Sequence, residues 1–301
     1  MMATVHIETV DDLVRVIGEL WEKKSLRAAK EFLAAIPNEE EFYRLIRMAD
    51  ESDLYGYSNL LATASYKHFG SLRSYAWHCV RFMENGRSLE AEEKILARLQ
   101  GIHADAYEDK ELVHAHHLLM KVYCQLNRIP EASEQLARIE ELGGARPDQQ
   151  AFFAIHSGDW DGAENILVEA LPDTKSRWST SIHLLYADLL AMRGAPERSL
   201  ELLMRAADEF PHVHAFRTEQ VSRLHQLGRY EQSLTEMEAA IKRNPYHSRK
   251  KLFIHLSAHC LYELERFDEL NKWIAQHPRE LKDSLYTKTE INPDGMHKKL
   301  S

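Results

Sequence analysis

Histidine is the residue type whose number and spacing could most readily support chemistry in this chain. The sequence holds 17 histidines, and His255 and His259 lie one helical turn apart, so on a helix their imidazoles share a face. Such a pair could give a metal ion two ligands, but a protein metal site needs at least a third. We therefore expect neither a metal nor another cofactor, and a histidine-lined surface that binds a metal or small ligand remains an alternative function.

The residue patterns of common enzyme sites are missing from the sequence. It contains no glycine-rich dinucleotide or phosphate loop, no H-E-x-x-H motif, no G-x-S-x-G turn and no C-x-x-C pair. Its many carboxylates fit solvated helix surfaces or i,i+4 ion pairs. We expect no catalytic residues and a protein that is not an enzyme.

Cysteines, hydropathy and charge together predict a soluble protein of the cytoplasm. Cys79, Cys124 and Cys260 are odd in number and far apart, as expected where thiols stay reduced. No run approaches the roughly 18 apolar residues that span a bilayer, and the N-terminus lacks a signal-peptide pattern. A formal net charge of −9 repels phosphate backbones. We therefore expect no membrane and no nucleic-acid partner, while the oligomeric state stays open.

The elements that would position these residues are helices. Hydrophobic residues make up 44% of the chain, and they recur mostly at helical spacing. Two segments, 193–211 and 227–245, align without gaps at an offset of 34 residues. They share a turn glycine, two small residues and a closing proline: Gly194 and Gly228, Ser199 and Ser233, Ala206 and Ala240, Pro211 and Pro245. Small side chains let helices approach, glycine permits a left-handed turn, and proline ends a helix.

This pattern resembles the tetratricopeptide repeat, a helix-turn-helix unit of about 34 residues with the signature W-x2-L-G-x2-Y, A-x3-F and P. More degenerate copies place their turn residues at Asn127, Gly158 and Glu265, and the resemblance covers about residues 71–278. It implies an all-α fold, an α-solenoid in which stacked antiparallel helix pairs form a right-handed superhelix.

Regions on either side of the repeats complete the predicted organisation. Residues 1–70 should form divergent helical pairs continuous with the solenoid, and Thr9 and Asp12 should cap the first helix. Residues 71–278 form the repeat array, and residues 279–301 should be an extended or frayed tail with no sheet. The helices expected in the first region lie near 10–24, 26–36, 39–50 and 54–68.

The resemblance also implies which residues face a partner, because the first helix of each pair lines the concave side of such arrays. In the pair that ends at Pro245, Val221 and Leu224 should pack on the second helix and leave the opposite stripe in the groove. Carried through the neighbouring copies, this register predicts a partner-binding groove lined by Arg73, His114, His117, Lys121, Asp188, Thr218, Ser222, His225, His255, His259 and Tyr262.

The function that the resemblance implies is a non-catalytic scaffold that binds a peptide or protein partner in this groove. A bacterial regulator that binds a short signalling peptide is an alternative with the same architecture. Histidine has an ordinary pKa near 6.5, so acidification should change the affinity for a partner.

One family ligand is not expected to bind. Co-chaperones of the family hold the C-terminal carboxylate of a chaperone with a clamp of lysines, asparagines and arginine. The matching positions here carry Ala76, Val80, His117 and Lys121, so only fragments of the clamp exist. We expect no tight binding of an acidic EEVD-type peptide.

Overall fold

The computed structural model describes most of the chain and divides it into two compact units. Unit 1 comprises Met1–Asp50 and Tyr55–Leu189, and unit 2 comprises Glu51–Leu54 and Leu190–Ser301. The described residues are 7–9, 11–16, 31–52, 54–101, 107–173, 178–243, 249–282, 289–291 and 297–299.

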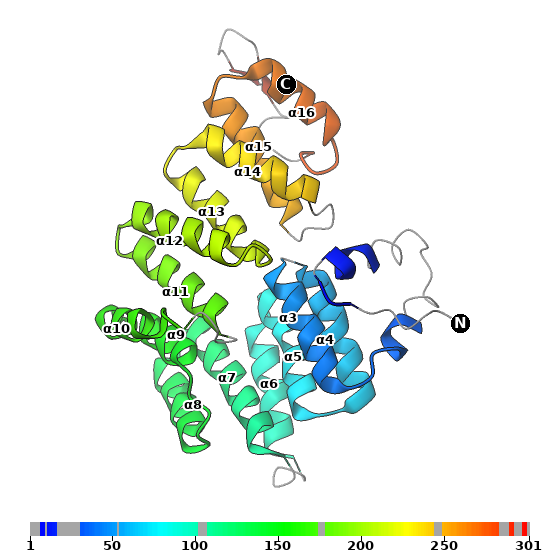
Figure 1. The fold of residues 1–301 in the computed structure, drawn as a ribbon, viewed down its shortest axis with the longest axis vertical. Coiled ribbons are helices and arrows are strands. Elements are labelled where there is room, and N and C mark those ends of the chain that lie inside the picture. The colour runs from blue at the N-terminus through cyan, green and yellow to red at the C-terminus, as the bar shows by residue number, and fades with distance from the viewer. Residues whose placement is uncertain are drawn as a thin grey trace. The chain divides into compact units, whose positions relative to one another are not determined.

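Helices follow one another along both units (Figure 1). In unit 1 they are α3 (Glu39–Glu51), α4 (Tyr55–Phe69), α5 (Leu72–Glu84), α6 (Ser88–Leu99), α7 (Asp109–Gln125), α8 (Ile129–Glu141), α9 (Pro147–Ser157), α10 (Trp160–Ala170) and most of α11 (Ser179–Met192). Unit 2 holds the end of α11, then α12 (Pro196–Glu209), α13 (His214–Gln226), α14 (Tyr230–Arg243), α15 (Lys250–Glu263) and α16 (Phe267–Gln276).

Consecutive helices pack against each other as antiparallel pairs. Contacts join α5 with α6, α7 with α8, α9 with α10, α13 with α14, and α15 with α16. The first helices of neighbouring pairs also touch in unit 1, where α7 lies between α5 and α9. This is the arrangement that a helical repeat predicts, and it places α5, α7 and α9 side by side.

The turn inside each pair has the same backbone form. Its key residue has a positive φ in every described case: Gly86, Asn127, Gly158, Gly194, Gly228 and Glu265. At Gly228 the amide donates to the His225 carbonyl at 3.1 Å and the next amide donates to the Leu224 carbonyl at 2.9 Å. These two hydrogen bonds form a Schellman cap, which satisfies free carbonyl groups at a helix end. Glu265 adopts it without the help of glycine, so the turn is confirmed even in the most degenerate copy.

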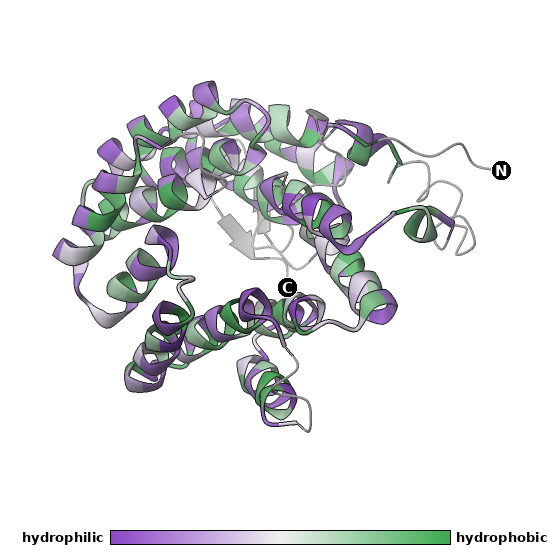
Figure 2. Cartoon of the chain, turned by 60° about the horizontal axis from the view of Figure 1, so that its bottom comes forward, coloured by the Kyte–Doolittle hydropathy of each residue, from purple (hydrophilic) through white to green (hydrophobic). Residues whose placement is uncertain are grey.

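Small residues lie where neighbouring helices meet, as the repeat pattern predicts. The residue five positions after each turn is fully buried, and it is small in all copies but the last: Ala91, Ala132, Ala163, Ser199, Ser233 and Leu270. Val221 packs in the same apolar cluster as Leu234 and Met237 of α14, which confirms that this stripe of α13 faces its partner helix. Hydrophobic and hydrophilic residues both occur along the helices (Figure 2), and in α12 the apolar side with Leu200, Leu203 and Ala206 is buried, which helps to hold the helices together.

The N-terminal region agrees with the prediction where it is described. The helices expected near 39–50 and 54–68 are α3 and α4. Residues 11–16 and 31–34 are helical, whereas the remainder of the first two expected helices lies outside the described residues. The Thr9 amide donates to the Asp12 carboxylate at 3.1 Å and the Asp12 amide donates to the Thr9 hydroxyl at 3.2 Å, so the expected cap is present.

The tail requires one correction. Strands β1 (Thr289–Ile291) and β2 (His297–Lys299) pair antiparallel, with Glu290 opposite Lys298. The expectation of no sheet is therefore wrong for this short ribbon. Its backbone N–H and C=O groups lie outside the helices and form hydrogen bonds between the two strands instead. No helix in the described part of the chain combines the length and apolar character needed to cross a membrane.

Candidate functional site

The face formed by α5, α7 and α9 in unit 1 carries a set of partly exposed rings and one cation. We call it the first-helix wall and define it by Trp77, His114, His117, Lys121, Phe152 and His156. All are partly exposed except His156, which is exposed. Because three consecutive first helices contribute, the wall follows the direction in which the pairs stack.

Ring contacts connect the three helices of the wall. The ring centroids of Trp77 and His114 are 5.2 Å apart at 33°, which joins α5 to α7. The Lys121 ammonium lies 5.4 Å from the centroid of Phe152, which joins α7 to α9, and Phe152 in turn packs on His156 at 4.1 Å. The wall therefore offers aromatic edges and faces that are already held in place by their neighbours.

Two histidines of the wall, His114 and His117, are neutral at physiological and mildly acidic pH. Burial among the helices, followed by the charges of Arg73, Arg146 and Lys121, lowers the pKa of His114 to about 3. Burial is also the main cause that holds the pKa of His117 well below its ordinary value. The prediction that these two histidines titrate near 6.5 is therefore wrong, because it ignored desolvation and the neighbouring cations. Neutral imidazoles can both donate and accept hydrogen bonds.

Arg146 anchors the start of α9 beside the wall. Its Nε and Nη2 donate to the two carboxylate oxygens of Asp148 at 3.0 and 3.1 Å, and its guanidinium stacks 3.5 Å from the centroid of Trp178. Only 8% of the Asp148 side chain is exposed. The next residue, Gln149, accepts from the Arg146 amide at 3.2 Å while its buried Nε2 has no partner. A bidentate pair that also stacks on indole fixes this part of the unit rigidly.

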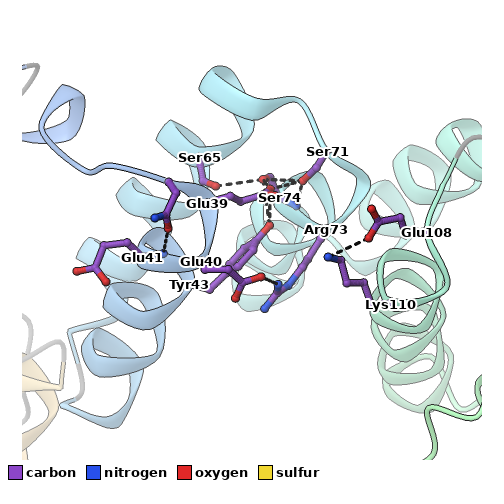
Figure 3. Close-up of polar contacts among 11 residues, drawn as sticks. Glu39, Glu40, Glu41, Tyr43, Ser65, Ser71, Arg73, Ser74, Glu108 and Lys110 are labelled. Atoms are coloured by element: carbon purple, nitrogen blue, oxygen red, sulfur yellow. Dashed lines mark hydrogen bonds and ion pairs between the residues drawn. The ribbon is translucent and has the colours of Figure 1, made fainter.

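Arg73 lies at the start of α5, at one end of a polar network (Figure 3). Its guanidinium pairs with Glu40 at 2.7 Å and lies 3.6 Å from the centroid of the Tyr43 ring. On the α7 side Lys110 pairs with Glu108 at 2.9 Å. Arg73 therefore makes its ion pair and its ring contact with α3, and we do not include it in the first-helix wall.

The centre of this network is the Glu39 carboxylate. It accepts hydrogen bonds from the Ser71 and Ser74 hydroxyls and from the Tyr43 hydroxyl, the last at 2.6 Å. Burial alone would raise the pKa of Glu39, but these bonds and the charge of Arg73 outweigh it and lower the pKa. Because Glu39 belongs to α3 and the serines to α5, the network joins the N-terminal helices to the first repeat.

Unit 2 brings two of its predicted histidines together. His225 Nε2 lies 3.1 Å from His259 Nδ1, with Tyr230 edge-on to both rings, and His259 Nε2 lies 3.6 Å from the Glu263 carboxylate. Burial, then the proximity of His259, lowers the pKa of His225. No group of three metal-ligating side chains occurs among the described residues.

The other predicted site residues have different surroundings. Thr218 is 2% exposed, so it offers no accessible surface, whereas Ser222, His255 and Tyr262 are partly exposed in unit 2. Asp188 is exposed on α11 in unit 1. The structure thus groups His114 with His117 and Lys121, groups His225 with His259, and buries Thr218.

Sequence reasoning missed the aromatic part of the wall. Phe152 lies six residues before its turn residue Gly158, as Lys121 does before Asn127. The same register therefore could have found it. No such signal exists for Trp77 or Trp178, which come into place through contacts with other helices.

Comparisons with known proteins agree with this architecture. No family model matches the sequence, and neither does any curated protein sequence. The crystal structure of yeast Tom70 superposes with a TM-score of 0.56 at 12% identity, over 94% of this chain and 58% of that chain. The TPR2AB-domain:pHSP90 complex of yeast Sti1 gives 0.31 at 8% identity, over 82% and 89%. The P58(IPK) TPR domain gives 0.30 at 16% identity, over 84% and 77%.

The class of protein follows from the helix pairs and from the first of these similarities. The described part of the chain has the fold of a helical repeat protein, stacked antiparallel helix pairs, apart from its short C-terminal ribbon. It spans little more than half the length of the Tom70 chain, and at 12% identity the likeness concerns the fold alone.

Proposed function

We propose that the protein is a non-catalytic scaffold that binds a peptide segment of a protein partner on the first-helix wall of unit 1. The observation that carries the proposal is the series of pre-positioned rings, with the cation of Lys121, on three consecutive first helices, α5, α7 and α9. An extended peptide that crosses them would meet Trp77, then His117 and Lys121, then Phe152.

The chemistry of the wall suits a peptide better than a charged small molecule. The aromatic rings bury apolar side chains, the neutral imidazoles can pair with peptide amides and carbonyls, and Lys121 contributes one cation. The rings are already fixed by mutual contacts, so binding would order few side chains and lose little entropy.

A displayed library of short random peptides tests this proposal for a partner of any sequence. We expect peptides selected against the parent protein to bind Phe152→Ala at least about tenfold more weakly, a loss of about 1.4 kcal/mol. The matched control is Trp160→Ala, which removes an exposed aromatic residue from the second helix of the same pair. Selected peptides that bind both variants as well as the parent would place the binding surface elsewhere.

Two further parts of the proposal concern what the protein does not do and where it acts. We propose no catalytic activity and no nucleic-acid partner. We propose a cytoplasmic location because all three cysteines are free and buried, which suits a reducing compartment. Fractionation of cells that express the native protein would test the location.

A further inference from the structure

A second candidate surface lies on the other side of α5, where α4 and α6 flank it. A cleft of about 540 Å³ opens there, lined by Tyr75 of α5 and by Leu89, Glu90, Glu93, Lys94 and Ala97 of α6. Leu89 is 66% exposed. The cleft is distinct from the first-helix wall, which uses other faces of α5.

The floor of the cleft continues as a row of stacked rings. Tyr66 of α4 packs on Tyr75 at 4.9 Å and on His78 at 5.6 Å, with His78 parallel to it within 14°. His78 then meets Phe82 edge-on at 5.7 Å. The Thr63 hydroxyl of α4 is 3.0 Å from His78 Nδ1, and Leu60, one turn before Thr63, is 48% exposed. The two helices that flank α5 therefore each carry an exposed leucine.

Cations surround this apolar floor. The Arg98 guanidinium lies 5.1 Å from the Tyr75 centroid, and Arg81 and Lys94 lie 5.4 and 5.2 Å from the Phe82 centroid. Burial is the main cause that lowers the pKa of His78 in this row. The charges of Arg81, Lys94 and Lys67 lower it further. Glu90 pairs with Arg87 and Lys94.

Part of this positive charge is not compensated. Lys67, Arg81 and Arg98 form no ion pair with any other described residue. The formal net charge of the chain is −9. Three such cations around exposed apolar surface make the charge of this region locally positive. Charge complementarity therefore selects an acidic occupant with apolar side chains.

We propose that the surface formed by α4, α5 and α6 docks an acidic amphipathic helix of a protein partner. Its apolar side chains would cover Tyr75 and Leu89, and its carboxylates would face Lys67, Arg81 and Arg98. A helix suits a groove between two helices because its apolar stripe can lie along the floor. A nucleic acid fits less well, because its phosphate backbone has no apolar side chains to cover Leu89.

A designed peptide tests the proposal directly. The probe is a fluorescein-labelled helical peptide of about 18 residues, five turns, with leucines at i, i+3, i+4 and i+7 and glutamates at the other positions. A second peptide carries lysine in place of glutamate, and an oligothymidylate of similar length serves as the nucleic-acid probe. We expect anisotropy at low salt to show saturable binding of the glutamate peptide only.

Variants locate the binding surface. We expect Lys67→Glu/Arg81→Glu/Arg98→Glu to weaken binding at least tenfold and Leu89→Ser to weaken it severalfold. Leu89 is exposed, so Leu89→Ser keeps the test valid if the triple variant folds poorly. The control Lys121→Glu reverses a cation on the first-helix wall and should leave binding unchanged. The two proposals can therefore fail separately. The peptide library and Phe152→Ala test the first-helix wall, whereas the glutamate peptide and Leu89→Ser test the surface of α4, α5 and α6.

Several outcomes would overturn the inference. They are no binding of the glutamate peptide, equal binding of the lysine peptide, and preferential binding of the oligothymidylate. Equal weakening by Lys121→Glu would move the site to the first-helix wall. A parent protein that sediments as a dimer and a Leu89→Ser variant that sediments as a monomer would assign the surface to a second copy of the chain.

Discussion

Both units carry histidines on their first helices, at different positions of the repeat, and the side chains have different surroundings. In α7 of unit 1, His114 and His117 lie among Trp77, Arg146 and Lys121, and burial with these cations keeps them neutral. In unit 2, His225 and His259 face each other instead. Neighbouring helices, rather than the repeat register, therefore set the surroundings of these histidines.

The same contrast applies to ion pairs, and it gives the largest expected effect. Arg146 and Asp148 in unit 1 are 17% and 8% exposed, while Arg249 and Glu219 in unit 2 are 31% and 21% exposed. Arg146→Met keeps an alkyl chain but leaves a buried carboxylate unpaired, so we expect a loss of about 3 kcal/mol in the free energy of unfolding. Arg249→Met should lose about 1 kcal/mol or less. Urea denaturation measures both, and equal losses would remove burial as the cause.

Packing of the small residues gives the next effect. Ala132 in unit 1 is fully buried, whereas Ala240 in unit 2 is 8% exposed. Leucine at either position would overpack the contact between helices, and we expect Ala240→Leu to destabilise by about 1–3 kcal/mol and Ala132→Leu by at least as much. Thermal denaturation is the measurement. If Ala240→Leu melts like the parent, the repeat register assigned to α14 is wrong.

The pH dependence of stability distinguishes the histidines of the two units. The folded-state pKa values of His114 and His117 lie below the unfolded value near 6.5, so below that pH only the unfolded state takes up protons. Their contribution is fully present above pH 6.5 and is lost as the pH falls, by up to about 1.4 kcal/mol per pH unit for each ring. His114→Gln/His117→Gln should therefore flatten the decline between pH 6.5 and 5.

The variant for comparison in unit 2 is His225→Gln. The pKa of His225 is also lowered, but the ring is less enclosed, so the substitution should change the slope less. Denaturant titrations across the pH range compare the three proteins. A parent and a double variant with identical slopes would contradict the enclosed, neutral histidines of α7.

The smallest expected effects concern binding. A peptide held on the first-helix wall should change its affinity by less than about twofold between pH 7.5 and 5.8, because His114 and His117 are not protonated in that range.

An EEVD-type peptide should show no saturable binding up to about 1 mM, since Ala76 is fully buried and His117 is neutral. Isothermal titration calorimetry measures the binding of both peptides, and micromolar EEVD binding would contradict the second prediction.

The sequence predicted the repeats well because their signals are local. Gly228 and Ser233 are set by the geometry of one turn and one helix contact, and both lie as expected. Thr218 was expected at the groove surface but is buried. The Arg146 stack on Trp178 and the neutrality of His117 depend on residues in other helices, and no spacing within one repeat encodes them.

The capped turns also bear on how the chain acquires its structure. The hydrogen bonds that close each pair join residues at most five positions apart, as between Arg229 and Leu224 or between Arg266 and Leu261. Contacts so close in sequence cost little chain entropy, and proteins rich in them fold in microseconds to milliseconds. In a repeat protein, any pair can then serve as the nucleus from which order spreads. On the ribosome, one pair would therefore close while the residues of the next are still being added.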